Sequence, residues 1–345
     1  MTRFHQEIAE QPAVAEEVLA AAAAPARAAA AAIAAADPAG LVIAARGTSD
    51  HAAVYAKYLF ETRNGLPVSL AAPSTFTLYR RPPRLDRFAV LAISQAGESA
   101  DVVEVVSEAR RQGAMTVALT NNPGSPLAGA AAHVVPITAG IERSVPATKT
   151  YTASLLALAL LSEALGPDRG FAIELARVPA AMAAVLGAEA ALRPLADELA
   201  GADRLAVLGR GYNLATALEV GLKLMETAYV VAEARSVADF LHGPIAIVEP
   251  GFPALLLAAA GPALPELRDL AAQLRRREAR VLTIGDGAGA LVEGAPAVGV
   301  DTGLPEELTP LSLAMAGQLL AAALAEARGL DPDRPRGLRK ITSTR

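Results

Sequence analysis

The sequence lacks cysteine throughout its 345 residues. That absence excludes disulfides, thiolate metal ligands and a cysteine nucleophile. The chain also has no GxxxxGKS/T loop, and GRGYN at 209–213 does not complete a GxGxxG fingerprint, which disfavours a nucleotide site. The sequence contains neither a metal-ligand cluster nor a Gly-x-Ser-x-Gly elbow. We therefore expect no metal and no organic cofactor.

An excess of basic residues is missing as well. The chain has 31 Lys and Arg against 36 Asp and Glu, a net charge of −5, and no long basic run. Nucleic-acid binding depends on clustered Lys and Arg, so we expect no nucleic-acid partner. A small anionic ligand is still compatible with this composition, because one strand-to-helix loop can hold a phosphate.

We find neither a secretory signal nor a convincing membrane span in the sequence. The first residues, MTRFHQEIAEQP, lack the charged-then-apolar order of a secretory signal. The segment Ala20–Ala36 resembles a membrane span by hydropathy, but it contains Pro25 and Arg27, and alanine is a helix former with little affinity for lipid. We predict a soluble helix here, no membrane partner and a cytoplasmic location.

Short apolar runs alternate with helical segments in both halves of the chain, on either side of an alanine-rich helical connection at 171–199. Strands are expected at Leu41–Ala45, Phe88–Ile93, Thr116–Leu119, His133–Pro136, Leu205–Leu208, Pro253–Ala258 and Ala279–Ile284. Strand, turn and helix in repetition predict parallel sheets with helices on both faces. The length allows two domains, and we expect two copies of a flavodoxin-like α/β architecture.

Two polar loops follow expected strands of the first half. SQAGES at 94–99 opens a helix, where hydroxyls, a glycine and free helix N–H groups favour an anion. ARGTSD at 45–50 has Gly47 for a tight turn and the hydroxyls of Thr48 and Ser49. A capped strand-to-helix turn would explain either loop alone. Because both loops leave the same edge of one sheet, they predict a phosphate-binding crevice together.

The expected helix Leu214–Tyr229 has Glu219, Lys223 and Glu226 on one face. A solvated stripe of salt bridges is one interpretation. The surrounding apolar residues favour another, in which the helix is buried and a carboxylate beside a lysine is tuned to move protons.

Two further features are ambiguous by themselves. His242, in HGP, is one of only four histidines and could be purely structural. The C-terminal GLRKITSTR contains a lysine in a polar tail that could equally be a disordered end.

Seven segments of this chain, in this order, resemble the sugar-isomerase (SIS) family, and specifically the isomerase half of glucosamine-6-phosphate synthase. They are QEIAEQP (6–12), RGTSDHAAVYAKYLFE (46–61), ISQAGESADVVE (93–104), AGIERSVPATKTYT (139–152), LGRGYNLATALEVGLKLMETAYVVAEA (208–234), DFLHGPIAIVE (239–249) and DPDRPRGLRKITSTR (331–345). Stand-alone SIS-type glucosamine-6-phosphate deaminases are more similar still. The resemblance implies two tandem SIS domains, each a flavodoxin-like parallel five-stranded sheet with helices on both faces.

The resemblance also implies a domain layout and a set of substrate contacts. The layout is an N-terminal helical segment (1–28), the phosphosugar-binding SIS domain (29–170), a second SIS domain (195–335) and an active-site tail (336–345). The implied substrate-binding residues are Arg46, Gly47, Thr48, Ser49, Ser94, Gln95, Ala96, Ser99 and Val145. Ser99 replaces a threonine of the synthase and keeps a hydroxyl. Ala96 replaces a serine, so one phosphate contact is lost or comes from the backbone. Arg46 replaces a cysteine and could add positive charge.

Four residues match the reacting end of the family's site. Glu226 matches the base that moves a proton between C1 and C2, and Lys223 the adjacent lysine. His242 matches the ring-opening histidine, which in the family comes from the neighbouring subunit and implies a homodimer with a shared active site. Lys340 matches the lysine that can form a Schiff base with the open-chain ketose.

These matches imply conversion of glucosamine 6-phosphate to fructose 6-phosphate and ammonia. Because the synthase uses a terminal cysteine to release ammonia from glutamine, we expect no glutaminase activity from this cysteine-free chain. A galactosamine-6-phosphate deaminase, another phosphosugar isomerase and a non-catalytic sugar-phosphate sensor are the alternatives.

Overall fold

The computed structural model describes residues 2–291 and 296–340, which divide into two compact units. The first, here the N-sheet unit, comprises Ala13–Glu142, Lys149–Ala176 and the chain from Arg339. The second, the C-sheet unit, comprises the residues up to Pro12, Arg143–Thr148 and Arg177–Leu338. Each unit contains one sheet, and each is described by itself.

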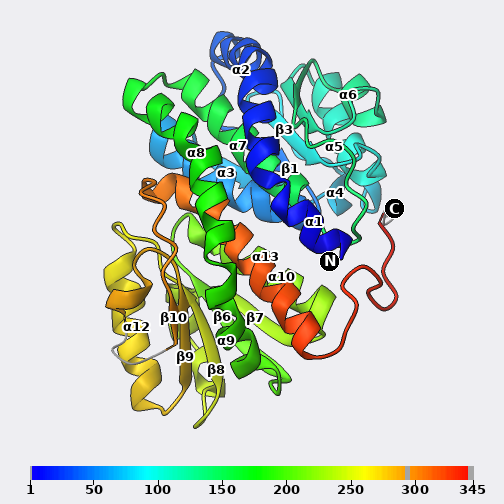
Figure 1. The fold of residues 1–345 in the computed structure, drawn as a ribbon. Coiled ribbons are helices and arrows are strands. Elements are labelled where there is room, and N and C mark those ends of the chain that lie inside the picture. The colour runs from blue at the N-terminus through cyan, green and yellow to red at the C-terminus, as the bar shows by residue number, and fades with distance from the viewer. Residues whose placement is uncertain (1, 292–295, 341–345) are drawn as a thin grey trace. The chain divides into compact units, whose positions relative to one another are not determined.

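The N-sheet unit is built on five parallel strands in the order β2-β1-β3-β4-β5 (Figure 1). Their bounds are β1 Leu41–Ala44, β2 Val68–Leu70, β3 Ala89–Ser94, β4 Met115–Thr120 and β5 His133–Pro136. Every residue of β1 and β3 is buried. Continuous apolar strands of this kind need helices on both faces of the sheet.

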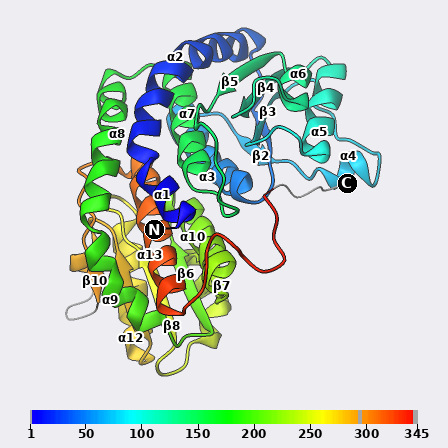
Figure 2. The ribbon, with the colours of Figure 1, turned by 45° about the vertical axis from the view of Figure 1, so that its right-hand side comes forward.

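Helices cover both faces of this sheet. Side chains of α4 (Ser74–Thr77), α5 (Ala100–Arg111) and α6 (Pro126–Ala130) pack with β1, β3 and β4 in one apolar cluster. Helices α3 (Thr48–Asn64) and α7 (Lys149–Leu165) contact each other and the sheet. Figure 2 shows α5 and α6 beside β3 and β4. Helix α2 spans Gln11–Ala36 and α8 spans Arg169–Gly187.

The C-sheet unit repeats this topology, with strands in the order β10-β9-β8-β6-β7. Its strands are β6 Arg204–Gly209, β7 Val231–Ser236, β8 Pro253–Leu257, β9 Arg280–Ile284 and β10 Ala297–Val298. Its helices are α1 Arg3–Ala9, α9 Glu189–Leu199, α10 Asn213–Ala228, α11 Val237–Leu241, α12 Leu264–Arg276 and α13 Thr309–Ala327, with short 3-10 turns at Pro244–Ile247, Ala288–Ala290 and Glu306–Leu308. Helices α11 and α12 pack on one face of the sheet, whereas α10 packs on β6 and β7 and contacts α13.

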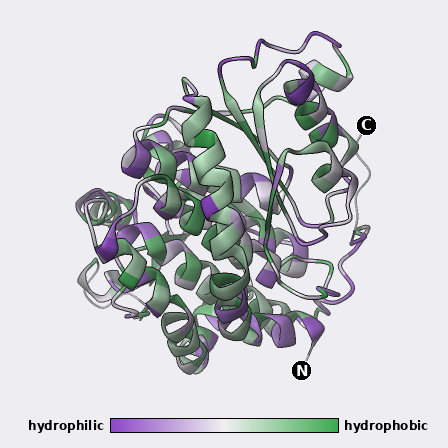
Figure 3. Cartoon of the chain, turned by 90° about the horizontal axis from the view of Figure 1, so that it is seen from above, coloured by the Kyte–Doolittle hydropathy of each residue, from purple (hydrophilic) through white to green (hydrophobic). Residues whose placement is uncertain are grey.

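The seven strands expected from the sequence are confirmed within two residues at each end, and both sheets are five-stranded and parallel. The strands that were not anticipated, β2, β7 and β10, all lie at sheet edges. The strands visible in Figure 3 are mainly green, the colour of apolar residues. The expected domain boundaries remain a prediction.

Among the residues that the structure describes, three helical stretches are long and apolar enough to cross a membrane: Gln11–Ala36, Arg169–Gly187 and Glu306–Ala327. In the last, 89% of the most apolar stretch is buried inside the protein, as a core helix requires. For the first two the buried share is 33% and 39%. The soluble character and cytoplasmic location expected from the sequence remain predictions.

Candidate active site

The loop between β3 and α5 is a tight turn at the carboxyl end of the sheet. Ser94 is buried, and its hydroxyl accepts a hydrogen bond from the backbone N–H of Gly97 at 3.2 Å. Gly97 has φ +68°, and a Cβ there would collide with Ser125, so this position requires glycine. The carbonyl of Gln95 accepts a hydrogen bond from the N–H of Asn121 at 3.0 Å. These contacts fix the path of the loop.

The amino end of α5 has the features of an anion site. Ser99 is the N-cap residue, but its hydroxyl makes no capping hydrogen bond to the helix. The first N–H groups of a helix have no partner within the helix and carry partial positive charge. The hydroxyl of Ser99 and this helix end can therefore bind a phosphate.

The loop after β1 leaves the sheet beside the loop after β3, because Ala44 pairs with Ala92 in the register of the two strands. Gly47, the N-cap of α3, has φ +54° and ψ −131°, a conformation that favours glycine. Nε of Arg46 donates to the carboxylate of Asp101 at 2.7 Å. Burial raises the pKa of Asp50 in the first turn of α3, an effect opposed by the charges of His51 and Arg46.

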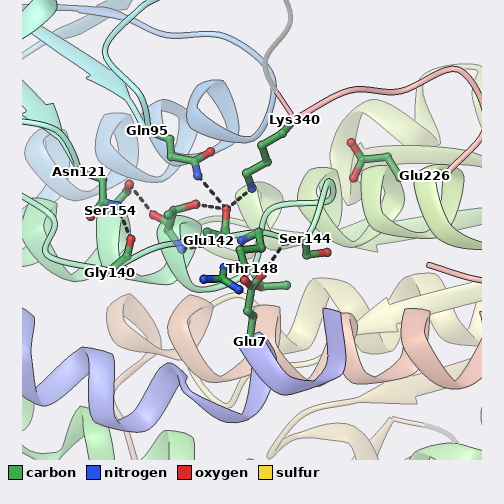
Figure 4. Close-up of polar contacts among 12 residues, drawn as sticks. Glu7, Gln95, Asn121, Gly140, Glu142, Ser144, Thr148, Ser154, Glu226 and Lys340 are labelled. Carbon is green, nitrogen blue, oxygen red and sulfur yellow. Dashed lines mark hydrogen bonds and ion pairs between the residues drawn. The ribbon is translucent and has the colours of Figure 1, made fainter. Parts of the chain in front are cut away.

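A buried carboxylate joins the phosphate-side residues to the C-terminal lysine (Figure 4). Oε2 of Glu142 accepts hydrogen bonds from Nζ of Lys340 at 2.6 Å and from Nε2 of Gln95 at 3.1 Å. Thr150 donates its hydroxyl to the same oxygen and its backbone N–H to Oε1. The side chain of Glu142 is fully buried, and that of Lys340 is 25% exposed. The structure therefore brings the predicted residues Gln95 and Lys340 together on a carboxylate that sequence reasoning did not single out.

The signal for Glu142 was present in the segment AGIERSVPATKTYT, where it is the only carboxylate. The spacing of residues could not indicate the role of Glu142, because its partners Gln95 and Lys340 lie 47 and 198 residues away in the chain. The last five residues of the expected active-site tail, 341–345, lie outside the described residues.

In the C-sheet unit, α10 contains a buried charge triad. Nζ of Lys223 lies 2.5 Å from Oε2 of Glu226 and 3.3 Å from Oε1 of Glu219. The side chains of Lys223 and Glu219 are 1% and 0% exposed, whereas that of Glu226 is 20% exposed. Interpretation as a solvated stripe is therefore wrong and the expected burial is confirmed, while the proton-moving role of the carboxylate remains a prediction. The sequence feature that correctly favoured burial is the set of apolar residues around the triad on this helix.

The charge state of this triad follows from its burial. Burial of Lys223 acts to lower its pKa, but the charges of Glu219 and Glu226, together with hydrogen bonds to both, outweigh it and leave the pKa raised. Lys223 is thus held as a cation beside Glu226. The partial exposure of Glu226 leaves one carboxylate of the triad accessible from outside.

The remaining predicted residues of the C-sheet unit are His242 and Val145. His242 is exposed and follows α11, with its backbone N–H bonded to the carbonyl of Asp239. Val145 is half-buried in the segment Arg143–Thr148. Glu7 fixes that segment by accepting the backbone N–H groups of Arg143 and Ser144 (Figure 4).

The predicted residues are thus divided between the units. Arg46 to Ser49, Ser94 to Ser99 and Lys340 belong to the N-sheet unit, while Val145, Lys223, Glu226 and His242 belong to the C-sheet unit. The predicted meeting of both sets on one sugar remains a prediction.

The C-sheet unit has loops in the corresponding places, but they are filled by the protein's own carboxylates. After β8, the N–H of Ala260 donates to Asp286 at 2.6 Å and the N–H of Ala263 to Glu306 at 3.5 Å. The carboxylate of Glu306 occupies the space that a Cβ of Gly261 would enter. Carboxylates of the protein itself therefore occupy these loops of the C-sheet unit.

The two units contain the same doubly wound α/β sheet, with a polar strand-to-helix loop in the first and a buried acid–lysine triad in the second. The SIS domain profile matches residues 36–164 and again 198–322. The chain belongs to the SIS family, with two tandem SIS domains.

Similar proteins agree with this assignment. The isomerizing glutamine–fructose-6-phosphate aminotransferase of Gloeobacter violaceus is 34% identical over 97% of this chain and 57% of that enzyme. The chain therefore spans little more than half the length of this curated relative. A solved structure described as a candidate phosphosugar isomerase from Silicibacter pomeroyi DSS-3 is 38% identical, covers 96% of this chain and 100% of its own, and has a TM-score of 0.88.

A glucosamine-6-phosphate deaminase structure from Thermotoga maritima has the same fold, with a TM-score of 0.79 over 99% of this chain and 100% of its own. Its sequence identity is 19%, so this likeness extends to the fold alone.

Proposed function

We propose that the protein is a phosphosugar isomerase that converts glucosamine 6-phosphate to fructose 6-phosphate and ammonia. The observation that carries the proposal is the triad on α10. A carboxylate that is 20% exposed, held 2.5 Å from a buried lysine, is a fixed and accessible proton acceptor. The names of similar proteins support the substrate class, since one acts on fructose 6-phosphate and another deaminates glucosamine 6-phosphate.

In the proposed reaction, the loop Ser94–Ser99 holds the 6-phosphate, and Thr48 and Ser49 bind nearby. Binding the far end of the sugar orients its reacting end. His242 assists opening of the pyranose ring. Its exposure on the C-sheet unit is compatible with service to a second copy of the chain, and we propose a homodimer with a shared active site.

Glu226 then removes the proton from C2 of the open-chain aldose and returns it to C1, through an enaminol. The product is an imine at C2, with a hydroxyl on C1. Attack by Nζ of Lys340 at C2 expels ammonia and leaves a Schiff base, which water hydrolyses to fructose 6-phosphate and free lysine. Glu142 holds Lys340 in place before this step. Backbone groups near Val145 contact the sugar.

The test is ammonia release by the Glu226→Gln variant, with Glu233→Gln as the matched control because Glu233 is a carboxylate outside the triad. We expect turnover to fall by two or more orders of magnitude in Glu226→Gln, with sugar-phosphate binding retained, and to stay near the parent value in the control. Ammonia release close to that of the parent protein from Glu226→Gln would reject the proposal.

A second candidate is a SIS enzyme with another sugar stereochemistry, such as a galactosamine-6-phosphate deaminase. The observation that favours it equally is the phosphate loop itself, because a loop that binds the 6-phosphate does not distinguish epimers at C4. Parallel assays with glucosamine 6-phosphate, galactosamine 6-phosphate, and fructose 6-phosphate plus ammonium separate these substrates. Release of ammonia from the galacto sugar alone would replace the gluco assignment.

A further inference from the structure

The ion pair between Arg46 and Asp101 is placed at the proposed phosphate loop. Asp101 is the second residue of α5, only two residues beyond Ser99, and its side chain is 1% exposed. One of its oxygens accepts from Nε of Arg46 at 2.7 Å, and the other accepts the N–H of Val102 at 3.0 Å. Asp101 is therefore held rigidly, and it holds Arg46 by one edge.

The two Nη groups of Arg46 take no part in its contact with Asp101. The side chain of Arg46 is 47% exposed. Within residues 2–291 and 296–340, its guanidinium forms a hydrogen bond through Nε alone. The register pairs Ala44, the last residue of β1, with Ala92 of β3, so the loop that contains Arg46 begins beside the end of β3 at Ser94. Arg46 therefore belongs to the first of the two loops expected to hold the phosphate, and its Nε contact ties it to the helix that follows the second.

The C-sheet unit contains the same pair in the corresponding position. Arg210 follows β6 as Arg46 follows β1, and its Nε lies 2.7 Å from Glu266 in the first turn of α12. There, however, Nη2 donates to the other oxygen of Glu266 at 3.3 Å, and Nη1 to Ser236 at 3.5 Å. All three guanidinium nitrogens of Arg210 therefore have protein partners.

The contrast between the two pairs points to their roles. Where the neighbouring loop is filled by Glu306 and Asp286, the arginine is fully bonded within the protein. In the N-sheet unit, within the part of the chain that the structure describes, the arginine is bonded through Nε and its side chain is 47% exposed. We infer that Asp101 is a positioning residue that aims the Nη groups of Arg46 at the 6-phosphate, making Arg46 the charged ligand of that phosphate.

This inference rests on the proposed function for the identity of the sugar, but its chemistry is that of any phosphomonoester. A guanidinium held by Nε presents two parallel N–H groups, which match two phosphate oxygens. The arginine also supplies a contact in a loop where Ala96 offers no hydroxyl. A lysine in its place has no planar fork and could not offer two parallel N–H groups held in a fixed orientation by Asp101.

The experiment measures the Kd of inorganic phosphate and of glucosamine 6-phosphate by titration calorimetry, together with kcat and KM, on the full chain. The variants are Arg46→Ala, Arg46→Lys and Asp101→Asn, and the matched controls are Arg210→Ala and Glu266→Gln. We expect Arg46→Ala to raise both Kd values and KM by about ten- to a hundred-fold. Arg46→Lys recovers little of this loss. Asp101→Asn raises the same constants, with kcat within about two-fold, since a positioning fault acts through binding. The two control variants leave all constants unchanged.

The Arg46→Ala variant tests whether Arg46 binds the phosphate even if Asp101→Asn fails to fold, because the Arg46 side chain is half exposed. Unchanged phosphate affinity in Arg46→Ala, or a parent protein that binds no phosphate, overturns the inference. Equal losses in Arg210→Ala also overturn it, since they would indicate a general effect of charge. A parent protein that binds phosphate through Arg46 but releases no ammonia contradicts the proposed function alone.

Discussion

Replacement of Lys223 by methionine tests the buried triad by its energetics. The substitution keeps an unbranched apolar side chain, shorter by the terminal nitrogen, and removes the cation from between two carboxylates, of which Glu219 is 0% exposed. A charge left uncompensated in such a position costs about 3–5 kcal/mol. We expect the free energy of unfolding of Lys223→Met to fall by that amount.

The pH dependence of this loss follows from the raised pKa of Lys223. A lysine whose folded pKa lies above its ordinary value of 10.5 contributes stability that is fully present below 10.5 and is lost as the pH rises through the folded value. The difference between parent and variant should therefore be constant from about pH 6 to pH 9, well below that window.

The assay is urea unfolding followed by circular dichroism, with two comparisons. Arg111→Ala, which removes a 74% exposed partner of Glu108, should cost less than about 1 kcal/mol. The double variant Glu219→Gln/Lys223→Met should regain most of the lost stability, because a neutral amide at position 219 does not need the charge of the lysine. Its turnover should stay low, since Glu226 remains without its lysine. A Lys223→Met loss as small as that of Arg111→Ala would refute the reasoning.

Three further predictions concern the other carboxylates. Glu142→Gln should lower turnover about ten- to a hundred-fold by loosening Lys340; equal turnover in a steady-state ammonia assay would contradict this. Burial, with the charges of Glu307 and Asp286, raises the pKa of Glu306, so its ionised form costs stability at neutral pH, and the cost disappears as the pH falls through the folded pKa. Glu306→Gln should accordingly melt slightly higher than the parent protein at pH 7 but not at pH 4; the opposite order would be inconsistent with the raised pKa. Calorimetry should give one sugar phosphate per chain, whereas two would show that the carboxylate-filled loops of the C-sheet unit are open.

The central strands of both sheets could be predicted because they are continuous apolar runs bounded by turn residues. Of the four edge strands only β5 was predicted, and β2, β7 and β10 could not be. Strand β7, Val231–Ser236, contains Glu233 and Arg235 and is only partly buried, so no hydrophobic pattern marks it. Strands β2 and β10 are three and two residues long, too short for a period to show.

The parts of the candidate site that are formed by residues close together in the sequence could be predicted. Loops 45–50 and 94–99 and the α10 triad contain their chemistry within a few residues, and helix geometry alone put the triad on one face. The role of Glu142 and the orientation of Arg46 by Asp101 arise from contacts between distant segments. No spacing rule connects residues 55 or 198 positions apart.

The carboxylates of Asp286 and Glu306 were missed for a related reason. They fill the C-sheet loops through pairings 26 and 43 residues apart, and only the repeated topology of the two sheets shows which loop of the first half they correspond to.

The central claim is that a single hexose phosphate spans both sets of residues. A crystal structure of the Glu226→Gln variant with glucosamine 6-phosphate measures this directly. The account predicts phosphate oxygens against the amide and hydroxyl groups of Ser94–Ser99, and C2 of the same molecule within about 3–3.5 Å of the side chain at position 226. A sugar bound at the loop with its C2 far from that side chain would contradict the account.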